Sequence, residues 1–409
     1  MPVIKLLVKG WIHVPHSYAM VNCFQLIFLE KYYGHVLDIY IQEMEYFRPH
    51  WNNARKLVYK KAYNEILQNI KEYNGEPVDL VYSITYPYNI TPISGVKKCV
   101  FYTSEFSALD PSYFTINGKG VLSEKQIMEG IRNLYFTSPS AWSARGMQLL
   151  NVPKSRNKII THGVDLDTFK YDSKDTVRDT YGINPGDVLL MNIGAMTRNK
   201  GITLILEAMN ILVNIRGHKQ YKLLLKGTGD LYETKQFLGV YISEFMQTGA
   251  ISKEKMDNLL DNHVIFTDKT LSYDTINKLY NAADVYVSPY IAEGFNLTTL
   301  EAIASGLPVI VPQTGSTKEY IQDIIENGGG DLVRYVNSVV VEADNGFRQN
   351  VIKLDDLVRT ILENTDHFTF VKKNRESIVN KVRDYLENNY SWKAVADQLY
   401  RYFTEIVEL

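Results

Sequence analysis

Short apolar runs alternate with longer segments of helical periodicity along the first half of the chain. Continuous apolar runs are typical of strands that are buried on both faces of a parallel sheet, and the periodic segments between them would supply the crossover helices. The pattern therefore predicts a sheet built from strand–helix–strand units. The predicted strands are KLLVKG (5–10), VLDIYI (36–41), DLVYSI (79–84), KKCVFYT (97–103) and NLYFTSP (133–139), and the predicted helices cover residues 17–33, 49–73 and 140–150.

The alternation pauses in the middle of the chain and then starts again. Residues 165–187 are polar and contain Gly-Ile-Asn-Pro-Gly, which is typical of a linker. Two successive alternating halves predict two doubly wound α/β domains. The tail from 353 to 409 is helical by pattern and is interrupted near Asn389–Ser391. The predicted strands of the second half are DVLLMNIG (187–194), YKLLLKG (221–227), HVIFTD (263–268), DVYVSPY (284–290), PVIVPQ (308–313) and VVVEA (339–343). Four helices are predicted between them: one that begins near 200, one that ends near 247, one that begins near 272 and one that follows Glu293.

The composition agrees with a globular protein of about two domains. The 409 residues are 45% hydrophobic and 22% charged, with a formal net charge of −2, so the basic excess of a nucleic-acid-binding protein is missing. The two cysteines, Cys23 and Cys99, exclude a disulfide framework and offer no metal-ligand spacing. The N-terminal run MPVIKLLVKG is too short for a signal peptide or a transmembrane segment. We therefore expect a soluble, cytoplasmic protein.

Chemically useful residues follow several predicted strands of the second half. Arg198 and Lys200 follow the first of these strands, Lys226 and Gly227 stand at the end of the second, and Glu293 follows the fourth. The carboxyl ends of parallel strands form the ligand-binding edge of doubly wound sheets. Cations and helix-start amides suit phosphates, and carboxylates suit hydroxyls. Each of these residues also has an ordinary alternative role, since a single lysine before a helix is usually a solvated surface charge.

Glu301 stands where the pattern predicts a dry surface. It falls on a helical stripe of apolar residues that includes Leu297, Leu300 and Ala304. An unpaired buried carboxylate costs several kcal/mol, so Glu301 must have a partner. That partner is either a ligand or a basic side chain in a structural ion pair.

The segment AEGFNLTTLEAIASGLPVIVPQTGSTKEYI, with Glu293 and Glu301 eight positions apart, resembles the E-x7-E motif of the retaining glycosyltransferases of family 4. NIGAMTRNKGITLILEAM resembles the first unit of that family's C-terminal domain, and SPSAWSARGMQLLNVPKSRNKIITHGVDLDTF resembles the end of its N-terminal domain. The resemblance covers roughly residues 133–345, whereas the first 130 residues agree only in architecture.

The resemblance implies a GT-B fold, in which two Rossmann-like domains face each other across a cleft that holds the active site. The last helix of this fold crosses back onto the first domain. We therefore expect an acceptor-side domain of residues 1–170 together with a C-terminal helix at about 392–409. Residues 182–391 would form the domain that binds the nucleotide sugar.

The resemblance also implies roles for individual residues. Glu301 would bind the ribose hydroxyls of the nucleotide, and Glu293 would contact the hydroxyls of the donor sugar. Lys200 would bind the diphosphate and act in catalysis together with Glu293. The other residues expected to bind the donor are Gly294, Gly194, Lys226, Gly227 and Ser17, together with the helix-start amides of Phe295, Asn296 and Leu297.

The chain departs from the family pattern in three places. Ala195 stands where the family commonly has an arginine, and we predict that Arg198 supplies the second catalytic cation. The loop that is usually Gly-Gly in the family contains His16 and Ser17 here. Glu105 occupies the position closest to a common family histidine. We place His16, Glu105 and His162 on the acceptor side.

The predicted reaction is transfer of a sugar from a nucleotide-diphosphate donor, most simply a UDP- or GDP-sugar, to a hydroxyl of a glycan or other acceptor. The resemblance implies that the anomeric configuration is retained, by attack from the face that the diphosphate leaves. No cofactor or metal is expected, and we interpret the D-x-D string Asp165-Leu166-Asp167 as structural. The alternatives are an epimerase or hydrolase of nucleotide sugars on the same fold, and a nucleotide-binding protein without catalysis. Rapid turnover of the donor alone would favour the first alternative.

Overall fold

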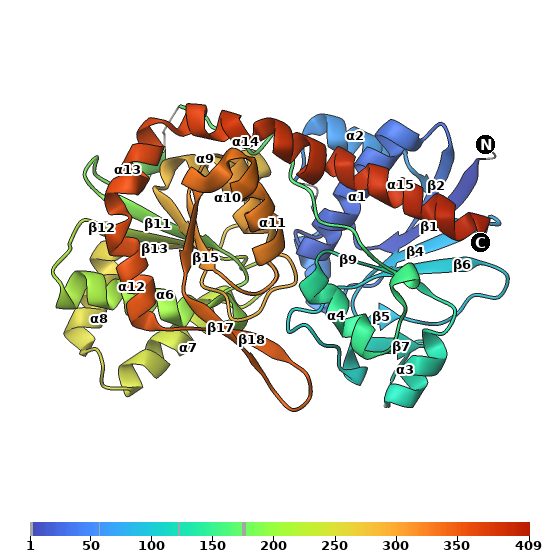
Figure 1. The fold of residues 1–409 in the computed structure, drawn as a ribbon, viewed down its shortest axis with the longest axis horizontal. Coiled ribbons are helices and arrows are strands. Elements are labelled where there is room, and N and C mark those ends of the chain that lie inside the picture. The colour runs from blue at the N-terminus through green and yellow to red at the C-terminus, as the bar shows by residue number, and fades with distance from the viewer. Residues whose placement is uncertain (1–2, 57, 122, 174–176) are drawn as a thin grey trace. The chain divides into compact units, whose positions relative to one another are not determined.

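The computed structural model describes residues 3–56, 58–121, 123–173 and 177–409, and the described chain divides into two compact units (Figure 1). Unit 1 consists of residues up to 163, together with 343–347 and 389–409. Unit 2 consists of residues 164–342 and 348–388.

Unit 1 is built on a parallel sheet of seven strands. The chain runs from β1 to β2 and β3 on one side of the sheet and then continues on the other side of β1, so β1 and β4 flank a topological switch point. A small second sheet consists of β5 (Tyr88–Asn89), β7 (Phe114–Ile116) and β8 (Lys119–Gly120). Across the main sheet the strands are β10 (Asn157–Ile159), β9 (Tyr135–Ser138), β6 (Lys97–Phe101), β4 (Leu80–Ile84), β1 (Ile4–Gly10), β2 (Leu37–Glu43) and β3 (Lys71–Glu72).

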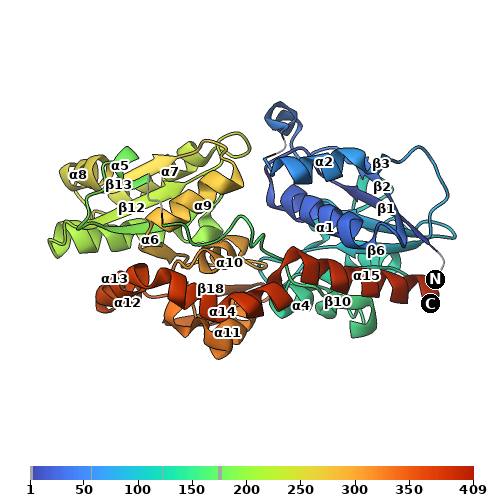
Figure 2. The same ribbon diagram turned by 90° about the horizontal axis from the view of Figure 1, so that it is seen from above.

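The first and last long helices of the chain pack together in unit 1. Helix α1 (Ser17–Tyr33) is buried from Ala19 to Leu29, as expected of a helix that is apolar all round. Helix α15 (Trp392–Glu408) lies beside it, where Trp392 stacks on Phe24 with ring centroids 5.1 Å apart (Figure 2). The other α-helices described in unit 1 are α2 (Lys61–Asn69), α3 (Glu124–Gly130) and α4 (Ala141–Leu149), and its 3-10 helices are η1 (Pro49–Ala54), η2 (Pro111–Tyr113) and η3 (Lys154–Arg156).

Unit 2 is built on a parallel sheet of six strands with its own switch point. The chain runs from β11 to β12 and β13 on one side of the sheet and returns to β14 on the other side of β11. The carboxyl ends of β11 and β14 therefore flank the position where doubly wound sheets bind ligands. Across the sheet the strands are β13 (Val264–Thr267), β12 (Tyr221–Lys226), β11 (Val188–Ile193), β14 (Val285–Val287), β15 (Val309–Pro312) and β16 (Val333–Val336).

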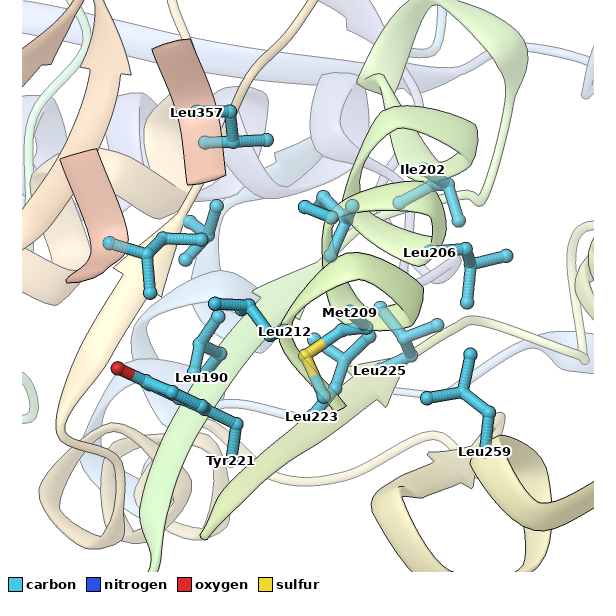
Figure 3. Close-up of a cluster of buried hydrophobic side chains, with 14 of the residues drawn as sticks. Leu190, Ile202, Leu206, Met209, Leu212, Tyr221, Leu223, Leu225, Leu259 and Leu357 are labelled. Atoms are coloured by element: carbon cyan, nitrogen blue, oxygen red, sulfur yellow. The ribbon is translucent and has the colours of Figure 1, made fainter. Parts of the chain in front are cut away.

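A large apolar core lies between this sheet and its helices. Leu190, Leu223 and Leu225 of the sheet are fully buried against Leu206 and Met209 of α6 (Figure 3). Burial of these side chains stabilises the frame from which the loops at the strand ends project. The helices of unit 2 are α5 (Val177–Thr180), α6 (Ile202–Asn210), α7 (Thr234–Gln247), α8 (Lys253–His263), α9 (Tyr273–Ala282), α10 (Leu297–Ala304), α11 (Lys318–Ile324), α12 (Leu354–Glu363), α13 (Thr365–Lys373) and α14 (Arg375–Tyr390).

The structure confirms most of the predicted strands and corrects three other predictions. The range 49–73, predicted as one helix, contains η1, α2 and the short strand β3, with residue 57 outside the described chain. VVVEA is not a strand of the main sheet, because β17 (Ser338–Glu342) pairs antiparallel with β18 (Arg348–Ile352) in a separate hairpin. The sixth place in the main sheet belongs to β16, which the apolar pattern did not single out.

The segment predicted as a linker is partly folded into unit 2. Residues 174–176 lie outside the described chain, but α5 follows them and its Arg178 is buried. The Arg178 guanidinium donates to Asp284 Oδ2 at 3.0 Å, and Lys372 reaches the other carboxylate oxygen at 2.8 Å. Asp284 directly precedes β14, so this buried network ties the segment to the central part of the sheet.

Candidate active site

Lys200 lies in the loop after β11, and tight packing of the backbone places it there. The next residue, Gly201, has φ +72°, and a Cβ at this position would lie 2.1 Å from the carbonyl oxygen of Pro289. Only glycine fits there. Asn199 accepts a backbone hydrogen bond from Ile291 N at 2.7 Å, and its side chain donates to Ala292 O at 3.0 Å. The loops after β11 and β14 are therefore fixed to each other.

This arrangement brings Lys200 and Glu293 into contact. The Lys200 ammonium forms an ion pair with Glu293 Oε1, and the two side chains are 22% and 10% exposed. The stem of Lys200 lies against Gly194, where a Cβ would be 3.7 Å from Lys200 Cγ. Two of the predicted catalytic groups therefore meet at the switch point of unit 2, and solvent still reaches the lysine.

The start of α10 is the third part of the site. Its N-cap, Asn296, is in the left-handed region at φ +71°, which asparagine tolerates better than most residues. The Asn296 amide donates to Ser288 Oγ at 2.9 Å, and its carbonyl accepts from the Tyr320 hydroxyl at 3.2 Å. Phe295 is buried and stacks on Tyr320 at 4.8 Å. These contacts hold the backbone of Gly294 to Leu297 at the opening of the helix, where amide groups and the helix dipole favour an anion.

Glu301 is buried one turn into α10 and has a partner that the sequence pattern did not predict. The Tyr280 hydroxyl of α9 donates to Glu301 Oε2 at 3.0 Å. Burial raises the pKa of Glu301 to about 8, although the hydrogen bond from Tyr280 and the charge of Lys226 both act to lower it. The carboxyl group is therefore largely protonated at neutral pH.

Lys226 and Gly227 lie at the carboxyl end of β12, the strand next to β11. Lys226 is buried, and its charge acts on Glu301. Gly227 N donates to Thr267 O at 2.7 Å, and a Cβ on Gly227 would lie 2.7 Å from Thr234 Oγ1. The glycine therefore lets the start of α7 pack close to the strand end.

The structure does not bring Arg198 to the Lys200–Glu293 pair. Its guanidinium donates to both carboxylate oxygens of Glu244 on α7, at 2.8 and 3.1 Å, and lies over the ring of Tyr241. The side chain is 67% exposed. A role of Arg198 at the diphosphate would require this surface ion pair to open, and it stays a prediction.

Residues 187–357 match the family model described as Glycosyl transferases group 1. The match covers less than half of the chain, and it agrees with the enzyme class predicted from the sequence.

Curated relatives are similar over the same region. An uncharacterized glycosyltransferase of Methanocaldococcus jannaschii is 27% identical over 214 residues, which is 50% of this chain and 49% of the relative. The lipopolysaccharide core biosynthesis mannosyltransferase LpsB of Rhizobium meliloti is 26% identical over 228 residues, which is 54% of this chain and 59% of LpsB. The chain thus spans about half the length of the curated relatives that it matches.

Solved structures share the fold of the whole chain. The crystal structure of HepE from Anabaena with UDP and glucose superposes with a TM-score of 0.62 at 14% identity, covering 98% of this chain and 100% of HepE. This likeness confirms the predicted GT-B fold of two Rossmann-like units. None of the helices in the described part of the chain combines the length and apolarity of a transmembrane span.

The residues predicted for the acceptor side lie in unit 1 and serve different local purposes. His16 caps α1, since its Nδ1 accepts from Tyr18 N at 3.1 Å. Ser17, which was predicted to bind the donor, also lies in unit 1 and is the exposed first residue of the same helix. Glu105 is exposed, and its carbonyl accepts from Trp142 Nε1 at 2.8 Å. His162 is buried near Phe101, and burial lowers its pKa to about 3, so its ring is neutral at physiological pH.

Asp165 of the D-x-D string organises a turn. Its Oδ1 accepts from Asp167 N at 3.2 Å, and its Oδ2 accepts from the hydroxyl of Thr168. Within the described residues there is no group of three or more His, Cys, Asp or Glu side chains arranged to hold a metal ion.

The sequence pattern did not reveal the tyrosines that support this site. Besides Tyr280, the Tyr286 hydroxyl donates to Thr298 Oγ1 at 2.7 Å and so fixes the first turn of α10 to β14. Both lie in TINKLYNAADVYV, the segment before the E-x7-E motif. The available signal was two tyrosines, Tyr280 and Tyr286, in the helix and the strand that directly precede α10 and its buried carboxylate.

Proposed function

We propose that this chain is a glycosyltransferase that moves a sugar from a nucleotide-diphosphate donor to a hydroxyl of a glycan or other acceptor with retention of configuration. The observation that carries the proposal is the Lys200–Glu293 pair beside the start of α10, at the switch point of unit 2. Unit 2 would bind the donor, and unit 1 would bind the acceptor.

Each part of the site suits one part of a nucleotide sugar. Glu301 would accept hydrogen bonds from the ribose hydroxyls, and Glu293 would accept them from hydroxyls of the sugar. Lys200 and the backbone amides from Phe295 to Leu297 would bind the diphosphate. The diphosphate would compete with Glu293 for the Lys200 ammonium, and that exchange would release the Glu293 carboxylate to the sugar. The presence of UDP or UDP-glucose in structures of HepE supports a UDP-sugar among the possible donors.

The reaction breaks the bond between the anomeric carbon and the diphosphate oxygen, and forms a bond from that carbon to the acceptor oxygen on the same face. The diphosphate leaves with the electron pair of the broken bond and takes the proton of the acceptor hydroxyl. Negative charge therefore grows on the phosphate in the transition state, where Lys200 and the amides of α10 are already oriented. The expected stabilisation comes from this preorganised positive charge, and no metal is required by the scheme.

A ligand panel tests the proposal. The full chain is heated with UDP-, GDP-, ADP- or dTDP-sugars, and a donor at 100 times its dissociation constant should stabilise the protein by about 2.7 kcal/mol. Glu293→Gln should abolish transfer while the protein still binds nucleotide. Glu254→Gln, which changes an exposed carboxylate on α8 of the same unit, is the matched control and should transfer normally.

Product analysis completes the test. The anomeric configuration of the product should equal that of the donor, and turnover should depend on the acceptor. Fast consumption of donor without acceptor would instead establish a hydrolase or epimerase. Absence of stabilisation by every nucleotide sugar would refute the assignment of unit 2 to the donor.

A further inference from the structure

A continuous network of hydrogen bonds joins the end of β11 to the start of α10. The Ile193 amide, at the end of β11, donates to the Tyr286 hydroxyl at 3.4 Å, and that hydroxyl donates to Thr298 Oγ1 at 2.7 Å. The Thr298 hydroxyl donates in turn to Asn296 Oδ1 at 3.1 Å, and Asn296 Nδ2 donates to Ser288 Oγ at 2.9 Å. Ser288 directly follows β14, so the network spans the two strands that flank the switch point of unit 2.

The network is shielded from water. Tyr286, Ser288 and Asn296 are buried, and Thr298 is half-buried. The Tyr286 hydroxyl also lies 3.3 Å from the Ile193 carbonyl, but its single proton is directed to the nearer acceptor, Thr298. Hydrogen bonds in such surroundings are stronger than in water, and successive donors in one direction reinforce one another. The three side chains of Tyr286, Thr298 and Asn296 should therefore act as one unit.

The network turns the Asn296 side chain away from the helix that it precedes. An asparagine at an N-cap usually accepts a hydrogen bond from an amide of the first turn. In the described chain the Asn296 side chain makes no such bond to α10, although Asn296 is its N-cap. Its oxygen is bound by Thr298, and its amide group is bound by Ser288. The side chain of the N-cap therefore does not compete with an anion for the amides of the first turn.

The network also holds the backbone conformation of the N-cap. Asn296 has φ +71° and ψ +65°, a left-handed conformation that most residues adopt only at a cost. The Tyr320 hydroxyl binds the carbonyl of Asn296, and the network binds its side chain. Glycine would adopt the same φ without strain, but it would have no side chain that Thr298 and Ser288 could hold. Asparagine at this position thus supplies both the conformation and the means of fixing it.

We propose that Tyr286, Thr298 and Asn296 are positioning residues for the diphosphate of the donor. Their side chains hold the backbone amides from Phe295 to Leu297 in the orientation that binds phosphate oxygens, and they keep the Asn296 side chain away from those amides. The inference rests on the proposed function, since it concerns the same diphosphate. The three side chains act through the backbone that they hold, because a binding group that is already rigid loses little conformational entropy when the ligand arrives.

The test compares ligands that contain a diphosphate with ligands that lack one. Calorimetric titrations of the full chain use UDP-, GDP-, ADP- and dTDP-glucose, inorganic pyrophosphate, and the nucleoside of whichever nucleotide sugar binds. Thr298→Val keeps the shape of the side chain and breaks the network at its centre. It should weaken binding of the nucleotide sugar and of pyrophosphate by about three- to tenfold, the usual worth of one hydrogen bond, and leave binding of the nucleoside unchanged.

A second variant separates the network from the backbone conformation. Asn296→Gly removes the side chain, but glycine tolerates a φ of +71°, so the protein should fold without strain. It should lose the same affinity for diphosphate ligands, about three- to tenfold. The double variant should lose no more than the larger single loss, because either change breaks the same network. Thr298→Ser, which keeps the hydroxyl, should bind nearly like the wild type.

Thr360→Val is the matched control. Thr360 is a half-buried threonine of α12 whose hydroxyl donates to the carbonyl of Asp356 at 2.8 Å, outside the network. This variant should bind every ligand like the wild type. Denaturant unfolding of each variant is measured alongside, and if Thr298→Val does not fold, Asn296→Gly decides the question.

Four outcomes would overturn the proposal. These are wild-type affinity for diphosphate ligands in Asn296→Gly, an equal loss for the nucleoside and the diphosphate ligands, losses that add in the double variant, and an equal loss in Thr360→Val. Failure of the proposed function would appear differently, because none of the four nucleotide sugars would then bind the wild type. Failure of the positioning inference would leave that binding intact and change only the comparison between variants.

Discussion

Glu301 gives the sharpest test of the donor site, because its ionisation should be coupled to binding. Burial raises its pKa to about 8 in the free protein, against the opposing effects of Tyr280 and Lys226. An ionised carboxylate accepts hydrogen bonds with both oxygens. In the protonated form one of the two oxygens carries a proton and donates a hydrogen bond. Binding of the two ribose hydroxyls should therefore favour the ionised form and release a proton.

The size of the effect follows from the pKa. Well below a pKa of about 8, affinity for UDP-glucose should fall about tenfold for each pH unit, which amounts to about 50-fold between pH 8, where half of the carboxyl groups are ionised, and pH 6. Affinity should level off above about pH 9, where the carboxyl group is almost fully ionised. UDP-glucose is preferable to UDP because its diphosphate diester does not titrate in this range, whereas the terminal phosphate of UDP does.

The assay is calorimetric titration across this range with two variants. Glu301→Gln keeps the shape of the side chain but cannot ionise, so its affinity should be independent of pH and about 1.5–3 kcal/mol weaker at pH 8. Tyr280→Phe removes a hydrogen bond that lowers the pKa of Glu301, so the midpoint of the profile should move to higher pH. A pH-independent affinity in the wild type would refute the coupling.

The same group should affect stability in the free protein. Its folded pKa of about 8 lies above the ordinary value of 4.5, so the folded state holds an extra proton between the two. The stability that this proton confers is present below about pH 4.5 and is lost as pH rises towards 8, at about 1.4 kcal/mol per pH unit. The difference in unfolding free energy between wild type and Glu301→Gln should follow that slope. A constant difference would mean that the carboxyl group titrates normally.

Further predictions concern the charges and the loop around the diphosphate. Lys200→Ala should reduce kcat/KM by about 100-fold or more, the usual loss when one preorganised transition-state contact is removed, and steady-state kinetics will measure it. Arg198→Ala should do comparable harm if Arg198 leaves its surface ion pair to bind phosphate, and turnover close to the wild type would show that it does not. Gly201→Ala should lower the unfolding free energy by about 1–3 kcal/mol, because Gly201 has a positive φ and the carbonyl of Pro289 fills the space that a Cβ would need. Denaturant unfolding measures this loss. Gly182→Ala is the control, since Gly182 also has a positive φ but lies in open surroundings. Activity should survive excess EDTA, and loss that Mn²⁺ restores would assign a metal role to Asp165 and Asp167.

The strand pattern was the most predictable part of the molecule, and the physical reason is visible in unit 2. Runs such as YKLLLKG are buried on both faces, so nearly every residue must be apolar and the signal is strong. VVVEA gave the same signal although Val339 and Val341 are exposed in a two-stranded hairpin. β-Branched residues favour strands in either setting, and composition alone does not report which neighbours a strand will find.

The position of a candidate site residue was predictable where the residue directly follows a strand. It was less predictable where side-chain packing determines the direction in which the residue points. Lys200 and Glu293 lie 93 positions apart, yet both follow central strands and so had to meet at one edge. Arg198 is only two residues from Lys200, but the 3-10 turn that contains both directs it to Glu244. The Tyr280 hydroxyl reaches Glu301 from another helix, which no local pattern specifies.

The close contact at Gly163 has a consequence for how this chain can be cut and rejoined. A Cβ on Gly163 would lie 2.8 Å from Trp392 N, so the places where the chain leaves unit 1 and returns to it are adjacent within unit 1. Residues 164–388, of which 343–347 alone belong to unit 1, are thus an insertion whose two ends start close together on unit 1. A short peptide that joins residue 163 to residue 389 should close unit 1 without strain, so each unit is a candidate for separate expression. Residues 164–388 could likewise be exchanged as one segment between proteins of this fold.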